Sequence, residues 1–199
     1  MACLRDLDPL FELVTPIPHV ALQQVLDNTE PWGIHSYAKS VNLDDLPDQA
    51  IEVLLTSLAS RRSPMSYVPM FPLRGRFAEV PDDATAWGSP RSTRWALALL
   101  GIAPDEESYA ADRSWARDLW QALRPYASDE GAYLNFETDT DEQRVRASYG
   151  EEKYGRLARL KTEWDPDNVF RHNPNIPPSA VGIPSPRRPE AARADETAR

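Results

Sequence analysis

The chain has 199 residues, enough for one domain with a sizeable core, and a formal net charge of −9. This acidic balance argues against a nucleic-acid or anionic-membrane partner. The single cysteine, Cys3, excludes an internal disulfide and a multi-thiolate metal site.

The N-terminus does not have the pattern of a targeting segment. Charged residues between Arg5 and Glu12 interrupt the apolar positions, and no run elsewhere is long enough to span a membrane. We therefore expect a cytoplasmic protein. The glycines form no Gly-x-Gly-x-x-Gly or Walker sequence, so the chain shows no phosphate-binding loop of its own.

The first half of the chain predicts short elements separated by turns. A helix is expected from Val20 to a stop at Asn28, followed by a turn at 31–33 and a strand over 35–40. Asp44 or Asp45 is then placed to cap a second helix, whose apolar residues run from Ile51 to Leu58.

Strand and turn chemistry follows, because short apolar runs are bounded by proline and glycine. The sequence predicts strands over 67–71 and 76–80. The longer apolar run over 93–100 suits a strand covered on both faces, with a helix as the alternative. After Pro104, three carboxylates suit the start of a helix that Pro125 ends.

The last third predicts a strand over 132–136 and helices over 141–148 and 151–164. An Asp-Pro-Asp-Asn turn at 165–168 is expected to stop the second helix and to direct Phe170 inward. Residues 179–199 read as a disordered tail after a domain of residues 1–178. The sum is an α+β fold, a mainly antiparallel sheet with helices packed on one face.

Short motifs occur in one order over about fifty residues of the C-terminal region. They are Gly131-Ala132-Tyr133-Leu134-Asn135-Phe136, Tyr149-Gly150-Glu151, Arg156-Leu157 with Lys161, Asp165-Pro166-Asp167-Asn168-Val169-Phe170, and Asn175-Ile176-Pro177. Together they resemble the C-terminal signature of the berberine-bridge-enzyme-like branch of FAD-linked oxidases. Segments 36–40, 73–75 and 85–91 are more weakly similar to upstream parts of the same family.

The resemblance implies the substrate-binding domain and the C-terminal segment of a flavoprotein. Family members are commonly more than twice this long, and their first half is an FAD-binding domain that this chain lacks. FAD is therefore the implied cofactor, held mainly by another stretch of protein. The implied partners are an FAD-binding domain supplied in trans, or a second copy through self-association, and a small-molecule substrate.

Tyr133 and Asn135 are the site residues that the resemblance implies. On a strand they would share one face, with Tyr133 beside the substrate as the catalytic residue and Asn135 next to the cofactor. Tyr133 would take the hydroxyl proton of an alcohol while hydride leaves the carbon for the flavin. A tyrosine base needs a nearby cation or donor, and Lys39 and Arg91 are the candidate cations. Half-buried packing is the structural alternative for Tyr133.

The sequence gives no reason to expect a metal site. His19, His35 and His172 do not have ligand spacing, and the acidic pairs suit helix caps or solvated faces.

Three hypotheses remain open for function. The chain is part of an FAD-dependent oxidoreductase, a non-catalytic protein that binds a small molecule or partner, or a remnant without activity. Self-association is expected where a face built for a flavin domain is left uncovered.

Overall fold

The computed structural model describes residues 6, 8, 12, 14–25, 27, 31–128, 131–172 and 174–179. The chain divides into two units, Met1–Ile34 and His35–Arg199. The first unit contains the predicted helix, α2 (His19–Gln23), which has no buried residues. Its expected stop at Asn28, the thiol Cys3 and the predicted tail beyond Ser179 lie outside the described residues.

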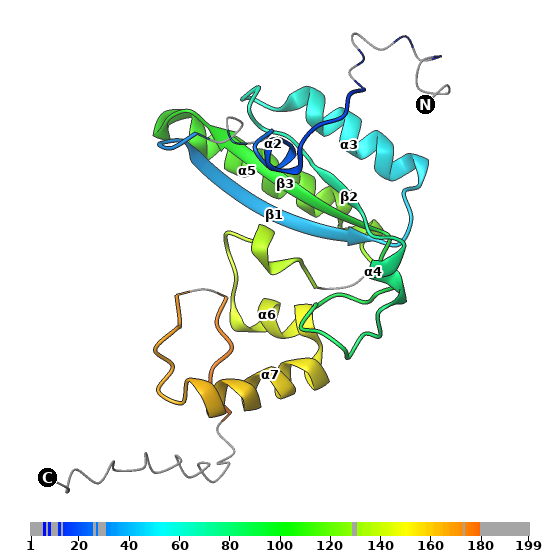
Figure 1. The fold of residues 1–199 in the computed structure, drawn as a ribbon. Coiled ribbons are helices and arrows are strands. Elements are labelled where there is room, and N and C mark those ends of the chain that lie inside the picture. Colours follow the sequence, from blue (N-terminus) through cyan, green and yellow to red (C-terminus); the bar gives the residue numbers. More distant parts are fainter. Residues whose placement is uncertain are drawn as a thin grey trace, which may run out of the picture. The chain divides into compact units, whose positions relative to one another are not determined.

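A three-stranded antiparallel sheet is the centre of the second unit (Figure 1). It contains β1 (His35–Leu43), β2 (Met70–Pro72) and β3 (Trp95–Ala103) in the order β1-β3-β2. The long pairing of β1 with β3 places apolar residues of both strands at alternate positions on one face. The predicted α+β fold, an antiparallel sheet with helices against one face, is confirmed.

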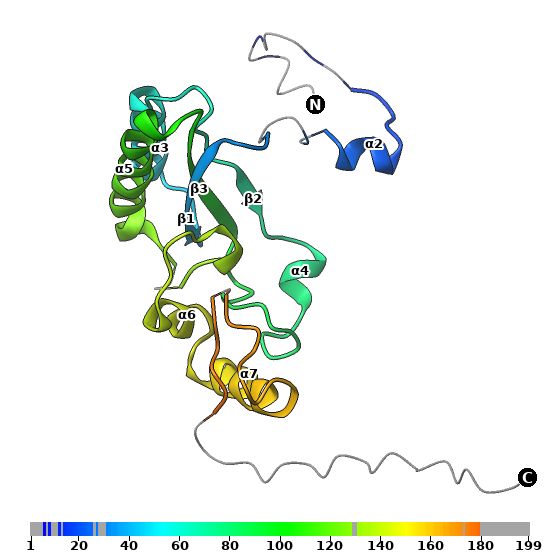
Figure 2. The ribbon, with the colours of Figure 1, turned by 90° about the vertical axis from the view of Figure 1, so that its left-hand side faces the viewer.

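Two helices cover that face, and Figure 2 shows them together on one side of the sheet. They are α3 (Asp48–Ser60) and α5 (Glu106–Leu123), and α5 begins where Asp105 accepts the N–H of Ser108 at 2.9 Å. The core between the helices and the sheet is formed by buried residues: Tyr37, Val41, Leu43, Ala50, Leu54, Leu97, Leu99, Trp115, Ala116, Leu119 and Leu123.

The C-terminal helices α6 (Glu142–Tyr149) and α7 (Glu151–Trp164) lie below the sheet in Figures 1 and 2. Asp141 caps α6 by accepting the N–H of Arg144, and Gly150 separates the two helices with a φ of 71°. Both helices agree with the sequence prediction, and the Asp-Pro-Asp-Asn turn follows α7 as expected.

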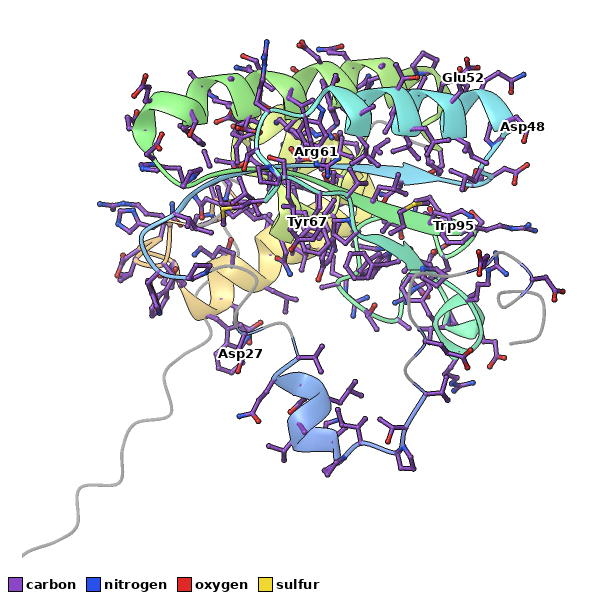
Figure 3. The ribbon with its side chains drawn as sticks, turned by 90° about the horizontal axis from the view of Figure 1, so that it is seen from above. Asp27, Asp48, Glu52, Arg61, Tyr67 and Trp95 are labelled. Atoms are coloured by element: carbon purple, nitrogen blue, oxygen red, sulfur yellow. The ribbon has the colours of Figure 1, made fainter. Side chains whose placement is uncertain are left out.

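The predicted start of α3 is wrong. The helix begins at Asp48 after Pro47, without a side-chain cap, and Asp45 accepts the N–H of Leu46 instead. Proline disfavours helical backbone in the residue before it, so the helix cannot begin at Asp44 or Asp45. Figure 3 labels Asp48 and Arg61 at the two ends of α3.

Two further predictions of local structure are wrong. Residues 76–80 are not a strand, because Gly75 turns the chain with a φ of 60° and α4 (Arg76–Glu79) follows with an ion pair between its end residues. Phe170 points outward and is 77% exposed, since Asp165 and Lys161 fix the turn through its backbone.

Gly101 allows α5 to lie close to β3. A Cβ at this position would be 2.4 Å from the backbone oxygen of Asp112, whereas a Cβ at Gly155 in α7 would meet nothing closer than 3.7 Å. We expect Gly101→Ala to lower the free energy of unfolding by about 1–3 kcal/mol. Gly155→Ala should raise it by roughly 0.5–1 kcal/mol. Urea denaturation of both variants checks this. An unchanged free energy of unfolding in Gly101→Ala would contradict the close packing.

Candidate active site

The outer edge of β1 holds the segment that carries Tyr133 and Asn135. Because β3 pairs with only one side of β1, the other side is available to residues 137–139. Ala38 N donates to Thr138 Oγ1 at 2.8 Å, and Thr138 N donates to Ala38 O at 3.0 Å. Next to them, the Tyr37 hydroxyl donates to Asp139 Oδ2 at 2.8 Å. Each bond joins groups about a hundred residues apart.

Glu137 is the centre of this attachment, and its side chain is fully buried. Its carboxylate pairs with Lys39 Nζ at 3.0 Å and with Arg144 Nη2 at 3.4 Å. It also accepts hydrogen bonds from Ser40 N at 2.8 Å and Ser40 Oγ at 3.1 Å. Two cations and two donors compensate the loss of water around the carboxylate.

Ser40, which binds Glu137, also binds the backbone of Tyr133 and so fixes its position. Tyr133 N donates to Ser40 Oγ at 3.0 Å, and Ala132 N donates to Ser148 Oγ at 3.0 Å. Phe136 N then donates to Tyr133 O at 2.8 Å, which closes the short 3₁₀ helix η2 (Leu134–Phe136).

The strand predicted over 132–136 is therefore wrong. Side-chain oxygens of β1 and α6 accept the backbone N–H groups that a strand would have paired with a neighbouring strand. The reasoning that placed Tyr133 and Asn135 on one strand face fails with it.

The two side chains nevertheless meet. Asn135 Nδ2 donates to the Tyr133 hydroxyl at 2.8 Å, with Tyr133 half-buried and Asn135 exposed. Both line a cavity of about 150 Å³ together with residues from 86–89 and the end of α6. Besides the bond from Asn135, a tyrosine oxygen has the capacity for a further hydrogen bond with a ligand.

An aromatic cluster fixes the ring of Tyr133. Trp87 stacks on it at 5.0 Å between centroids, and Phe136 meets it edge-on at 4.9 Å. Phe136 in turn stacks on Phe71 of β2 at 5.6 Å. Such pairs restrict the ring to one orientation, so its hydroxyl is presented at a fixed place.

Tyr149 brings a second phenol to the same cavity. Burial raises the pKa of Tyr149, and the neighbouring Tyr133 raises it further. Tyr149 is therefore a neutral hydrogen-bond donor at physiological pH. Sequence reasoning missed Tyr149 and Trp87 as site residues, although both lie in segments that carry the family resemblance.

The two candidate cations are not in hydrogen-bond contact with Tyr133. Lys39 donates to Glu137 and, at 3.0 Å, to Asp139 O. Arg91 donates to Phe77 O and Thr85 Oγ1, and its guanidinium lies 5.9 Å from the centre of the Trp87 ring. Among the described residues, Asn135 alone is hydrogen-bonded to the Tyr133 hydroxyl.

The loop that carries Trp87 is held by α7. Lys153 Nζ donates to Trp87 O, and Arg156 Nη1 donates to Asp83 O at 2.8 Å. At Gly88 a Cβ would be 2.5 Å from Ser148 O, so only glycine fits this close approach to α6. Arg156, one of the motif residues, therefore has a structural role in holding this loop.

The residues present fit one part of a flavin site. A hydroxyl, an amide and aromatic rings suit contact with a substrate group or a ring edge, but the cavity is smaller than the roughly 300–1,000 Å³ that encloses a drug-sized ligand.

The described part of the chain holds no cluster of three metal-ligating side chains. None of its helices has the length and apolar character needed to cross a bilayer.

Comparison with known proteins locates this site in a recognisable family segment. Residues 132–177 match the sequence model of the family described as berberine and berberine like. We call residues 132–177 the berberine-like segment. The resemblance inferred from the sequence is thus confirmed, and the berberine-like segment contains Tyr133, Asn135 and Tyr149.

Curated relatives extend the similarity beyond the berberine-like segment. An FAD-linked oxidoreductase of Dictyostelium discoideum is 27% identical over 171 residues, which cover 85% of this chain and 37% of that protein. An (R)-6-hydroxynicotine oxidase of Paenarthrobacter nicotinovorans is 34% identical over 119 residues, covering 54% of this chain and 25% of that protein. This chain thus spans about a third, or less, of the length of such relatives.

Solved structures share the fold. Berberine bridge enzyme from Eschscholzia californica superposes with a TM-score of 0.65 at 22% identity, over 75% of this chain and 34% of that chain. A berberine bridge enzyme-like protein of Arabidopsis thaliana gives a TM-score of 0.65 at 19% identity, over 78% of this chain and 36% of that chain.

Removing the charge of Glu137 should destabilise the whole second unit. Glu137→Gln leaves Lys39 buried without its counter-charge, so we expect a loss of about 3–5 kcal/mol in the free energy of unfolding. Glu79→Gln, at the exposed Arg76 pair, is the matched control and should cost less than about 1 kcal/mol. Equal effects of the two variants in urea denaturation would show that the buried pair is unimportant.

Tyr37 should make stability fall at high pH. Burial, and then its hydrogen bond to Asp139, raise the pKa of Tyr37 from 10.0 to about 12. The stabilisation is complete below pH 10 and is lost as the pH rises towards 12, because the folded state resists ionisation that the unfolded chain allows. Between these values Tyr37→Phe should lose stability less steeply than the wild type in urea denaturation. Parallel curves would contradict the assignment.

Proposed function

We propose that this chain is the substrate-binding and C-terminal part of an FAD-dependent oxidoreductase. In this proposal it oxidises an alcohol, or a similar C–H group, of a small molecule. The observation that supports it most is the hydrogen-bonded pair of Tyr133 and Asn135 at a small cavity within the berberine-like segment. The Dictyostelium relative, named as an FAD-linked oxidoreductase, supports the cofactor.

In the proposed reaction Tyr133 holds the substrate hydroxyl and accepts its proton. The phenolate form of Tyr133 takes the O–H proton of the alcohol and becomes the phenol, while a hydride leaves the carbon, so that the alcohol becomes a carbonyl compound. When bound, FAD supplies the acceptor for that hydride. Asn135 fixes the Tyr133 oxygen, and the neutral Tyr149 supplies a second donor for the substrate oxygen.

The FAD-binding domain is proposed to come from another stretch of protein, supplied in trans, with self-association as the alternative arrangement. Asn135 would lie against the cofactor, since its side chain is exposed at the cavity. The small size of the cavity supports this arrangement, because a cofactor that the cavity cannot enclose has to be bound by further protein as well.

A non-catalytic binding role is the second candidate. It is favoured by the two candidate cations, Lys39 and Arg91, which make their hydrogen bonds elsewhere. Under this reading the cavity retains a ligand but Tyr133 moves no proton.

Co-expression with an FAD-binding domain of this family separates the two roles. We expect a yellow complex whose flavin absorbance is bleached anaerobically by an alcohol from a substrate panel. Tyr133→Phe should slow the bleaching by about 10²–10⁴-fold, the usual contribution of a general base. Tyr109→Phe, whose ring packs on His35, is the matched control and should leave the rate unchanged.

The outcomes bear on different claims. A yellow complex with full activity in Tyr133→Phe would refute the assigned base. A complex that binds the panel alcohols without bleaching would favour the non-catalytic role. Failure of every FAD-binding domain to form a yellow complex would contradict the proposed partner.

A further inference from the structure

A second concavity, separate from the Tyr133 cavity, is lined by arginines. It has a volume of about 590 Å³ and shares no lining residue with the Tyr133 cavity. Its lining contains no carboxylate: Leu73, Arg74, Gly75, Ala78, Arg91, Ser92 and Arg94. Three positive charges in one concavity are unexpected on a chain with a net charge of −9.

The backbone brings the three arginines together. Leu73 N donates to Arg94 O at 2.8 Å, where β2 ends and β3 begins. Arg74, the residue that follows Leu73, is therefore on the segment next to Arg94. Trp95, labelled in Figure 3, marks that end of β3. The backbone of Arg91 is fixed by its N–H, which donates to Asp82 Oδ1 at 2.7 Å.

Aromatic rings hold the guanidinium groups of Arg74 and Arg91 without neutralising them. Arg74 lies over the Trp95 ring at 5.2 Å, and Arg91 lies over the Phe77 ring at 4.5 Å. The partners of the Arg91 guanidinium are a carbonyl and a hydroxyl, and its buried Nε has no hydrogen-bond partner. Within the described part of the chain, none of the three arginines forms an ion pair. Positive charges that line one concavity without a counter-charge favour an anion in it.

We propose that Arg74, Arg91 and Arg94 form a binding site for a small molecule that carries a phosphate or carboxylate group. Planar guanidinium groups present paired N–H donors that match the oxygens of both anions. The ring contacts of Arg74 and Arg91 restrict both side chains before the anion arrives, which lowers the entropy lost on binding.

The surroundings favour a small anion over a large polyanion. The volume lies within the range of small-molecule pockets. Glu79 and Asp82 lie close by in sequence, and the chain as a whole is acidic. A nucleic acid, an anionic membrane or an acidic protein would meet this repulsion over its whole contact area, whereas a recessed phosphate meets the arginines first.

Isothermal titration calorimetry with inorganic phosphate, pyrophosphate and citrate tests the site. We expect saturable 1:1 binding of at least one of them, weakened by added sodium chloride. Arg94→Gln should reduce the affinity about tenfold or more, because a charged donor is lost. Arg62→Gln, an exposed arginine after α3, is the matched control and should bind like the wild type.

Arg91→Lys provides a second variant, which keeps the charge but loses the paired donors, and it should also weaken binding. The proposal is overturned if no anion binds saturably, or if Arg94→Gln and Arg62→Gln weaken binding equally. Tighter binding of an acidic peptide than of all three small anions would overturn it in favour of a protein partner. None of these results depends on FAD, so they leave the proposed oxidoreductase role unaffected.

Discussion

The buried carboxylate of Glu137 is the interaction on which the candidate site depends. It joins Lys39 and Ser40 of β1 to Arg144 of α6, and so connects the sheet with the helices below it. A buried carboxylate tolerates little displacement, because each lost partner leaves an uncompensated charge in a medium of low polarity. The backbone of Tyr133, held by the same Ser40, takes its position from this requirement.

This arrangement explains how a site forms without regular secondary structure. Residues 131–140 make few mutual bonds, yet successive residues of β1 each bind a group within them. The edge of a sheet normally presents unpaired backbone groups that invite association. Here the berberine-like segment covers part of that edge, and in doing so it places a hydroxyl and an amide side by side.

The sequence predicted the elements that local chemistry decides. The long strands β1 and β3 and the helices α5, α6 and α7 follow from apolar spacing, acidic first turns and the proline after α5, and all are present. Residues 132–136 were misassigned as a strand because their alternation suits one, whereas Ser40 and Ser148 satisfy their N–H groups from distant parts of the chain. The proximity of Trp87 and Tyr149 to Tyr133 likewise depends on long-range packing, which a single sequence does not reveal.

The loop over 82–91 lines both concavities, each with different residues. Trp87 faces Tyr133 on one side, while Arg91 lies against the rings of Phe77 and Trp87 and lines the arginine concavity. Bonds from Lys153 and Arg156 of α7 hold this loop, and Asn42 donates to Ser89 at 2.6 Å from β1. A shift of the loop would therefore alter both concavities together, so an anion among the arginines and a ligand beside Tyr133 are expected to influence each other's binding reciprocally.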